Sequence, residues 1–220
     1  MNERILLIGG GGHCKSVLDS LLRLEIYSDI GIIDVQENVG RNLLGISVVG
    51  CDDDLERLFK KGYGNAFVTL GSIGNPTNRI RLLNRITAVG FRIPAIIDSS
   101  AIVSSDAQIG TGVFIGKGAI INAGCVINTG VIINSGAIIE HDCIIGAFAH
   151  VAPGTVLSGG VQIGENTHIG AHSVIRQQLT IGSGVTIGIG SVVVADIEKD
   201  VIAYGNPCRE VRLSNEKDKF

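Results

Sequence analysis

A six-residue repeat dominates the C-terminal part of the chain and constrains its fold more than any other feature. An aliphatic residue returns at every sixth position, without insertion, over sixteen consecutive hexads. These anchor residues are Ile97, Val103, Ile109, Ile115, Ile121, Ile127, Ile133, Ile139, Ile145, Val151, Leu157, Ile163, Ile169, Ile175, Ile181 and Ile187. A strict repeat of this kind is typical of a solenoid, because each unit can bury its apolar side chain only against its neighbours.

The composition of each hexad predicts a parallel β-helix. The fourth position is often glycine, which adopts a left-handed backbone at a corner without steric cost, and the fifth is small or branched. Three hexads would form a triangular coil of eighteen residues, so that each residue stacks on the one eighteen positions later. Adjacent coils would then lie about 4.8 Å apart, the usual strand spacing. The narrow prism leaves little room for rings, in agreement with an aromatic content of 4%.

Residues 1–95 follow a different pattern, in which apolar runs alternate with amphipathic segments. We expect strands at 4–8, 30–35, 46–49, 66–70 and 93–97, and helices at 14–24, 52–61 and from Asn75-Pro76 onward. Strands that alternate with helices predict a small Rossmann-like α/β domain with a parallel sheet. The expected organisation is an α/β domain over 1–95, a β-helix over 96–212 and a charged tail over 213–220.

A glycine-rich loop from Gly9 to His13 follows the first predicted strand and opens the first predicted helix. Backbone N–H groups and the helix dipole attract phosphate at such a position. Neither register of the loop supplies the third glycine of the dinucleotide fingerprint, so we do not expect a dinucleotide. Asp34 ends the second predicted strand, where an acid often meets a ribose or a base. The alternative is a tight turn with a solvated carboxylate.

Charge and cysteine content exclude several classes of protein. The net charge of −3 gives no reason to expect a nucleic-acid partner. The five cysteines are odd in number and irregularly spaced, which favours a reducing cytoplasm over a disulfide framework. Cys125 and Cys143 lie eighteen residues apart, and we interpret them as stacked core residues rather than as a metal pair. Gly and polar residues interrupt every apolar stretch, so we expect no membrane span.

The repeat is interrupted at His141 and Asp142, which are the strongest candidates for chemistry. Asp142 stands at a fourth position, where most hexads have glycine, and His141 precedes it at an outward third position. Ala123 and Gly159 lie eighteen residues before and after His141, so small neighbours leave space beside the imidazole. A histidine with a carboxylate partner can act as a general base near neutral pH. The alternative is a solvated surface pair without a role in chemistry.

These features together resemble the bacterial sugar acetyltransferases of the PglD/NeuD type, which belong to the hexapeptide-repeat acyltransferases. The resemblance depends on the Gly-Gly-His loop, the small α/β domain, the hexads and the closing sequence Tyr204-Gly205-Asn206-Pro207-Cys208. It implies that the β-helix is left-handed and that the α/β domain holds a nucleotide-linked sugar, commonly a UDP-sugar. The substrate-binding residues that it implies are Gly11, Gly12 and His13 at the phosphates, Asp34 at the base, and Gly71 and Ser72. Val35 stands where the family often has a second acid.

The resemblance also implies a reaction. His141 would deprotonate an amino or hydroxyl group of the sugar, which attacks the thioester of acetyl-CoA, and Asp142 would orient His141, although the family often has Glu there. The implied cofactor-binding residues are His150 near the thioester oxygen, Gly159, Ala171, Gly188, Ile189 and Pro207. The expected product is an acetylated UDP-4-amino-sugar for glycan, capsule or sialic-acid biosynthesis, made by a cytoplasmic homotrimer without a metal.

Other interpretations of these residues stay open. Packing at a subunit contact would also explain His150, and Gly188 stands at a second hexad position that is often glycine anyway. His150, His168 and His172 raise the alternative of a hexapeptide-fold zinc enzyme of the carbonic anhydrase type. A non-catalytic trimeric scaffold is a further alternative.

Overall fold

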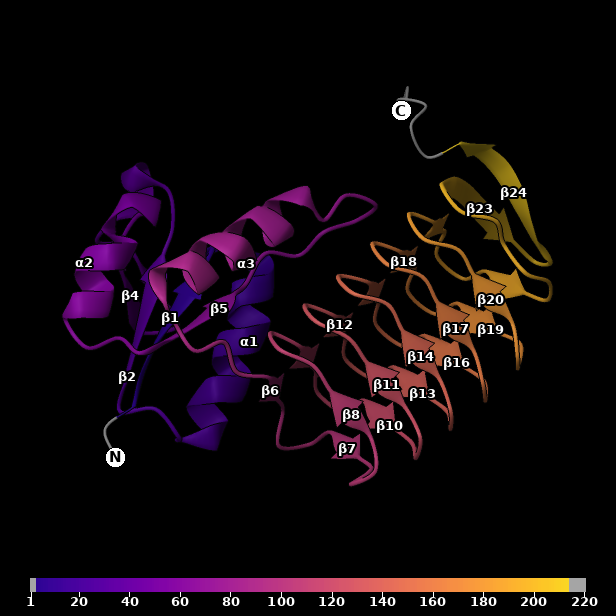
Figure 1. Cartoon of the computed structure of the whole chain (residues 1–220), viewed down its shortest axis with the longest axis horizontal. Coiled ribbons are helices and arrows are strands. Elements are labelled where there is room, and N and C mark those ends of the chain that lie inside the picture. The colour runs from indigo at the N-terminus through magenta and orange to yellow at the C-terminus, as the bar shows by residue number, and fades with distance from the viewer. Residues whose placement is uncertain (1–2, 214–220) are drawn as a thin grey trace.

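A computed structural model describes residues 3–213 of the chain. An open sheet with its helices forms the N-terminal part, and a prism of short strands forms the rest (Figure 1). The predicted fold class, an α/β domain followed by a left-handed parallel β-helix, is confirmed. The charged tail that we expected at 213–220 lies, except for Leu213, outside the described residues. Within the described part, no helix has the length and apolar character needed to cross a bilayer.

The N-terminal sheet has the strand order β3-β4-β2-β1-β5. Its strands are parallel except for β3, which pairs antiparallel with β4. The strands are β1 (Arg4–Ile8), β2 (Asp29–Ile33), β3 (Asn42–Leu43), β4 (Ile46–Gly50) and β5 (Asn65–Val68). The helices are α1 (Gly12–Leu24), η1 (Gln36–Asn38), η2 (Asp52–Asp54), α2 (Leu55–Lys60) and α3 (Thr77–Val89). Strand β1 is buried on both faces, which explains its unbroken apolar sequence.

The strand that we expected at 93–97 is shorter and belongs to the other part of the molecule. It is β6 (Ile96–Ile97), and it pairs with a strand of the β-helix rather than with the N-terminal sheet. Arg92 makes only an isolated bridge to Asn65 at the end of β5. The chain therefore leaves the N-terminal sheet before Ile96, because the backbone of β6 bonds to the next coil.

The β-helix has three faces, and each successive strand moves to the next face. Face 1 contains β6, β9 (Phe114–Ile115), β12 (Ile132–Ile133), β15 (His150–Val151), β18 (His168–Ile169), β21 (Thr186–Ile187), β23 (Val201–Gly205) and β24 (Cys208–Leu213). Face 2 contains β7 (Ile102–Val103), β10 (Ile120–Ile121), β13 (Ile138–Ile139), β16 (Val156–Leu157), β19 (Val174–Ile175) and β22 (Val192–Val193). Face 3 contains β8 (Gln108–Ile109), β11 (Val126–Ile127), β14 (Ile144–Ile145), β17 (Gln162–Ile163) and β20 (Thr180–Ile181).

The register of these strands confirms the predicted stacking. Ile115 pairs with Ile133, and Ile133 pairs with Val151, each eighteen residues later. The anchor side chains from Ile115 to Ile187 are buried inside the prism, together with Cys125 and Cys143. Most corners use glycine with a positive φ, such as Gly112 at 67°. Each coil thus buries its apolar residues against the coils before and after it.

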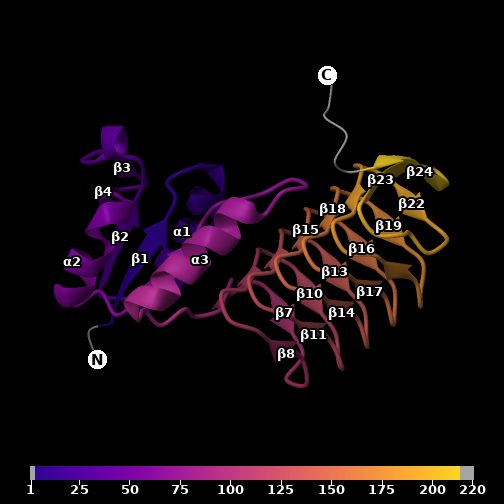
Figure 2. The ribbon, with the colours of Figure 1, turned by 45° about the horizontal axis from the view of Figure 1, so that its top comes forward.

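The N-terminal part packs on face 1 mainly through α1 (Figure 2). Ile96, Phe114 and Ile132 stack along this face and join one buried cluster with α1 and the sheet. At the next two coils the outward residues become His150 and His168. The first turn of α3 contacts this region, because its residue Arg79 donates hydrogen bonds to the carbonyl oxygens of Gly130 and Phe148. The two parts of the chain therefore share one apolar junction.

We expect Phe114→Ala to lower the free energy of unfolding by about 3 kcal/mol or more, the usual cost of removing a buried Phe ring. Phe114 is 1% exposed and lies between α1 and the first coils. Urea denaturation followed by circular dichroism measures the change. Ile26→Ala, at a position that is 58% exposed, serves as the control. A loss no larger than that of the control would contradict the packing described for the junction.

Candidate active site

His141 and Asp142 lie at the corner between faces 2 and 3, in the turn that joins β13 to β14. Nδ1 of His141 lies 2.8 Å from Oδ2 of Asp142. An ionised carboxylate only accepts hydrogen bonds, so Nδ1 carries the proton and Nε2 keeps a free lone pair. A cavity of about 450 Å³ opens here, lined by His141, Asp142, Ser158, Gly159, Gly160, Gln177 and Gln178. The ring can therefore take a proton from a molecule in this cavity.

Two glycines in adjacent coils make room for the pair. A Cβ on Gly159 would lie 2.5 Å from Nε2 of His141, so only glycine lets the imidazole lie over the next coil. A Cβ on Gly124 would lie 2.4 Å from Oδ1 of Asp142. Asp142 itself has a φ of 61°, the left-handed conformation that glycine supplies in most hexads. Phe148, Asn166, His172 and Gln178 adopt the same conformation at the same hexad position, so the corner accepts a side chain here and the site depends on the chemistry of Asp142.

The carboxylate of Asp142 raises the pKa of His141 above its usual value, mainly through their hydrogen bond. Both side chains are well exposed. The neutral imidazole, which is the form that accepts a proton, consequently predominates only above this raised pKa. The pair has the geometry of a general base and its orienting acid.

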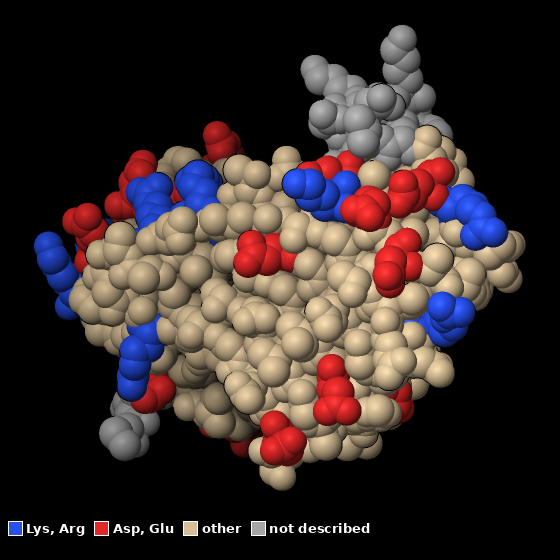
Figure 3. All heavy atoms as spheres, turned by 45° about the vertical axis from the view of Figure 1, so that its right-hand side comes forward, with Lys and Arg blue, Asp and Glu red and all other residues tan. Residues whose placement is uncertain are grey.

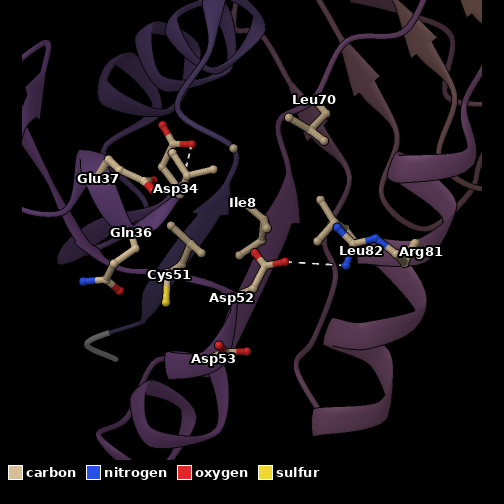
Figure 4. A pocket seen from close by; sticks show the side chains of 13 residues that line it. Ile8, Asp34, Gln36, Glu37, Cys51, Asp52, Asp53, Leu70, Arg81 and Leu82 are labelled. Atoms are coloured by element: carbon tan, nitrogen blue, oxygen red, sulfur yellow. Dashed lines mark hydrogen bonds and ion pairs between the residues drawn. The ribbon is translucent and has the colours of Figure 1, made fainter.

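A second cavity lies in the N-terminal part, at the carboxyl ends of β1, β2, β4 and β5 (Figure 4). Its volume is about 420 Å³, and its lining includes Ile8, Gly9, Ile33, Asp34, Val35, Gln36, Glu37, Cys51, Asp52, Asp53, Leu70, Arg81 and Leu82. Open parallel sheets bind ligands at this edge. Asp34 accepts hydrogen bonds from the Val35 amide at 2.8 Å and from Asn38 at 2.9 Å. A Cβ on Gly10 would collide with Asp34, at 2.5 Å from Oδ2.

The glycine-rich loop leads from this cavity to the start of α1. Gly11 and Gly12 have open space where a side chain would be, and no side chain caps the helix. The first amides of α1 are therefore open to an anion, as the sequence predicts. The side chain of His13 instead packs on face 1, edge-on to Phe114 with ring centroids 5.2 Å apart. Burial, with help from His150 and Arg79, lowers the pKa of His13 to about 4.

Gly71, Ser72 and His150 form a group on face 1, away from His141. Nδ1 of His150 donates a hydrogen bond to the carbonyl oxygen of Ser72 at 2.9 Å, and its ring lies 4.9 Å from that of His168. Gly71 lies beside His13. Burial lowers the pKa of His150, and it lowers that of His168 to about 4. The structure therefore brings together His13, Gly71, Ser72 and His150, all of which the sequence singled out, and separates them from His141.

Three of the expected cofactor-binding residues, Gly159, Ala171 and Ile189, lie at two corners of the prism, whereas His150 lies on face 1. Gly159 lies at the corner between faces 2 and 3, beside His141. Ala171 and Ile189 stack one coil apart at the corner between faces 1 and 2, where Ile189 is 81% exposed. Gly188 lies under Tyr204, since a Cβ there would be 2.6 Å from Cβ of Tyr204. Pro207 follows β23. Face 2 separates the two corners.

Several residues that line these sites were not found from the sequence. Asp52 and Asp53 stand at the start of the helix expected at 52–61, and no pattern in the sequence marks them, Arg79 or Arg81 as site residues. The available signal was the place of Asp52 directly after a strand, at the edge where Asp34 also lies. The residues that the structure describes contain no group of three or more His, Cys, Asp and Glu side chains that could hold a metal ion. His172 packs over Gly154 rather than beside His150 and His168.

Comparison with known families divides the chain as its architecture does. Residues 4–86 match the model of the PglD N-terminal domain. Residues 142–177 match the model of the bacterial transferase hexapeptide with six repeats. A search of curated proteins found no match.

Solved structures resemble the chain over almost its whole length. A mutant of perosamine N-acetyltransferase from Caulobacter crescentus, in complex with CoA and GDP-perosamine, is 34% identical, with a TM-score of 0.90 over 96% of this chain and 98% of that one. The acetyltransferase domain of PglB from Neisseria gonorrhoeae, in complex with acetyl coenzyme A, is 36% identical, with a TM-score of 0.90 over 96% and 100%. WeeI from Acinetobacter baumannii, at 23% identity and a TM-score of 0.84 over 95% and 100%, shares the fold.

The N-terminal match, the hexapeptide match and the likeness over whole chains agree with one another. The chain therefore belongs to the bacterial sugar acetyltransferases of the PglD type, acetyl-CoA-dependent enzymes of the hexapeptide-repeat acyltransferase family.

Proposed function

We propose that the protein transfers an acetyl group from acetyl-CoA to an amino group of a nucleotide-linked sugar, in the biosynthesis of a glycan, a capsule or a sialic acid. The observation that carries the proposal is the His141–Asp142 pair, whose free Nε2 faces a cavity. Two relatives with CoA or acetyl-CoA bound support the donor, and one of them, with GDP-perosamine bound, supports a sugar amine as acceptor. The five free cysteines suit the reducing cytoplasm, where we place the reaction.

The proposed reaction needs one base and no covalent enzyme intermediate. The sugar amine attacks the thioester carbon, and Nε2 of His141 takes the proton that the nitrogen loses. The new C–N bond forms, the C–S bond breaks, and the protonated imidazole returns its proton to the leaving thiolate. Asp142 holds the ring in the required tautomer and stabilises the imidazolium. His150 is engaged with Ser72 on face 1, and we propose that it holds the 71–72 loop in place.

The position of His141 within the prism supports a site shared between copies of the chain. The corner with His141 lies opposite face 1. The N-terminal part, which holds the proposed nucleotide cavity, packs on face 1. No residue lines both cavities. The side of the prism opposite to the N-terminal part thus holds the base, and we propose that a neighbouring copy brings its nucleotide-bound sugar to it.

Face 2 is the surface through which we propose that the copies associate. Its outward side chains form an unbroken aliphatic ladder from one end of the prism to the other. They are Ile102, Ile120, Ile138, Val156, Val174 and Val192. Figure 3 shows one side of the molecule, on which uncharged residues cover a broad area and the acidic and basic side chains are scattered around and within it. Exposed apolar surface of this extent is typical of an interface.

Packing through face 2 would place two different corners near each other. The corner with His141 and Gly159 would approach a neighbour's corner with Ala171 and Ile189. These are the residues that we expect to contact acetyl-CoA, and one chain holds them on opposite edges of face 2. A closed ring of three copies would form three identical sites, so we propose a homotrimer.

His141→Ala should lower turnover by about two to four powers of ten, the usual share of a general base, while acetyl-CoA still binds. Steady-state kinetics and calorimetry measure the two quantities. Glu165→Ala is the matched control, since Glu165 is an exposed residue at the same hexad position of another corner. Turnover within threefold of the wild-type value would exclude His141 as the base.

Asp142→Asn should move the acidic limb of the pH–rate profile to lower pH. The carboxylate raises the pKa of His141, so the wild-type enzyme loses its neutral base as the pH falls through that raised value. Without the carboxylate the pKa falls, and the base stays neutral to lower pH, although turnover at the plateau also drops. The profile of kcat/KM against pH measures the shift. An unchanged limb would show that another group controls it.

Ile138→Arg should produce a folded monomer that binds no acetyl-CoA, because it places a charge at the centre of face 2. Sedimentation, circular dichroism and calorimetry report the assembly, the fold and the affinity. Val126→Arg, at the same hexad position of face 3 and similarly half-buried, should leave the assembly intact. A folded Ile138→Arg monomer with wild-type affinity would place the whole cofactor site within one chain.

A further inference from the structure

We propose that the nucleotide cavity reads a guanine base through Asp52 and Arg81, so that the preferred substrate is a GDP-linked sugar rather than the UDP-linked sugar expected from the sequence. This inference rests on the proposed function, because it names the nucleotide of the same substrate. Asp52 follows β4 and Arg81 lies on α3, so the cavity brings together residues from two separate elements.

The cavity offers apolar walls and one adjacent pair of opposite charges. Ile8, Leu70 and Leu82 form a wall suited to the face of a flat ring. Asp52 extends between Ile8 and Leu82 and points to Arg81 (Figure 4). Oδ2 of Asp52 lies 3.6 Å from Nη1 of Arg81, which is an ion pair without hydrogen-bond geometry. Both groups therefore keep hydrogen-bonding capacity for a ligand.

Of the other carboxylates that line the cavity, Glu37 is exposed, and Asp34 and Asp53 already have hydrogen-bond partners. Both oxygens of Asp34 already accept hydrogen bonds, from the Val35 amide and the Asn38 side chain. Asp53 bonds to Arg85 at 2.9 Å, and its side chain is 91% exposed. Asp52 interacts with Arg81 and Arg85 only at 3.6 Å. Among these carboxylates, Asp52 is thus the one that combines partial burial with unused acceptors.

Guanine presents the pattern that this pair complements. Its N1–H and N2–H groups are neighbouring donors that one carboxylate can accept together, as it accepts the two N–H groups of an arginine. Its O6 and N7 atoms follow on the adjacent edge, and arginine is the usual donor to them. A carboxylate and a guanidinium side by side therefore match the order of donors and acceptors along the base.

Uracil presents a different order, in which a single N3–H donor lies between two carbonyl oxygens. A carboxylate at Asp52 would accept that one hydrogen and would place its second oxygen against a carbonyl. The uracil complex thus lacks one charge-assisted hydrogen bond and gains a repulsion. Bonds of this type contribute about 1.5–3 kcal/mol, so we expect GDP to bind about 10- to 100-fold more tightly than UDP.

Calorimetry of the full chain with GDP and with UDP tests this preference. The informative variant is Asp52→Asn, because an amide presents one acceptor and one donor, which match N3–H and a neighbouring carbonyl of uracil. This variant should lose most of its affinity for GDP and should bind UDP at least as well as the wild type. Glu56→Gln removes the same charge from an exposed position of α2 outside this cavity, and it should keep the wild-type ratio.

Arg81→Ala gives a second and independent measurement, which also serves if Asp52→Asn does not fold by circular dichroism. It should lower the affinity for GDP by about tenfold, because it removes the donors to O6 and N7. It should lower the affinity for UDP by less. Equal affinities of the wild type for GDP and UDP, or tighter binding of UDP, would overturn the inference. An unchanged ratio in both Asp52→Asn and Arg81→Ala would also overturn it.

Activity measurements separate this inference from the proposed function. Acetyl-CoA is supplied with a GDP-linked and a UDP-linked 4-amino-sugar, and the products are identified by mass spectrometry. We expect acetylation of the GDP-linked sugar with the higher kcat/KM. Acetylation of the UDP-linked sugar alone would refute guanine recognition and leave the acetyltransferase function standing. Acetylation of neither sugar, in a protein that binds GDP through Asp52, would refute the proposed function instead.

Discussion

The stacking of each residue on the one eighteen positions later is the constraint on which the rest of the structure depends. Backbone hydrogen bonds between coils hold this register along all three faces. Because the register is uniform, the side chain at one hexad position determines how much room its neighbour one coil away has. His141 can lie over the next coil only because residue 159 is glycine, and Asp142 can lie over the preceding coil only because residue 124 is glycine. A side-chain pair of this kind in a solenoid thus requires glycine in the coils on both sides.

The triangular cross-section of the prism also determines where the N-terminal cavity and the His141–Asp142 pair lie relative to each other. The outward residues of face 1 are apolar up to Ile132, where the N-terminal sheet and α1 cover this face. In the next two coils they are histidines. The opposite corner carries His141 and Asp142. Because one chain holds the N-terminal cavity and this pair on opposite sides of the prism, we propose that copies of the chain share their sites. Face 2 borders the corner of His141, and its aliphatic ladder is the surface that we propose for that sharing.

The histidines show how environment separates a structural role from a chemical one. Burial lowers the pKa of His13, His150 and His168, so these rings are neutral packing and hydrogen-bonding groups at physiological pH. His150 holds the carbonyl of Ser72, and His13 packs on Phe114. His141 is exposed, and Asp142 raises its pKa. Opposite shifts in one residue type distinguish the candidate base from the histidines of the junction.

The sequence by itself determined the β-helix, its register and its candidate base. A six-residue period that repeats sixteen times can be recognised without any knowledge of distant contacts. An interruption such as His141-Asp142 is visible against it. The order of strands and helices in the first 95 residues was also predictable, because apolar runs and amphipathic segments are local patterns. The last of the expected strands, β6, belongs to the prism instead.

Only the tertiary structure decided which distant residues meet. Asp52 and Arg81 approach across the nucleotide cavity, and Arg79 reaches the coil carbonyls of Gly130 and Phe148. Asp52, Arg79 and Arg81 belong to no repeat, and each looks like an ordinary surface charge in the sequence. Their partners are set by how α3 packs against β5, α2 and the prism. That packing depends on contacts between segments far apart in the chain and not on any local pattern.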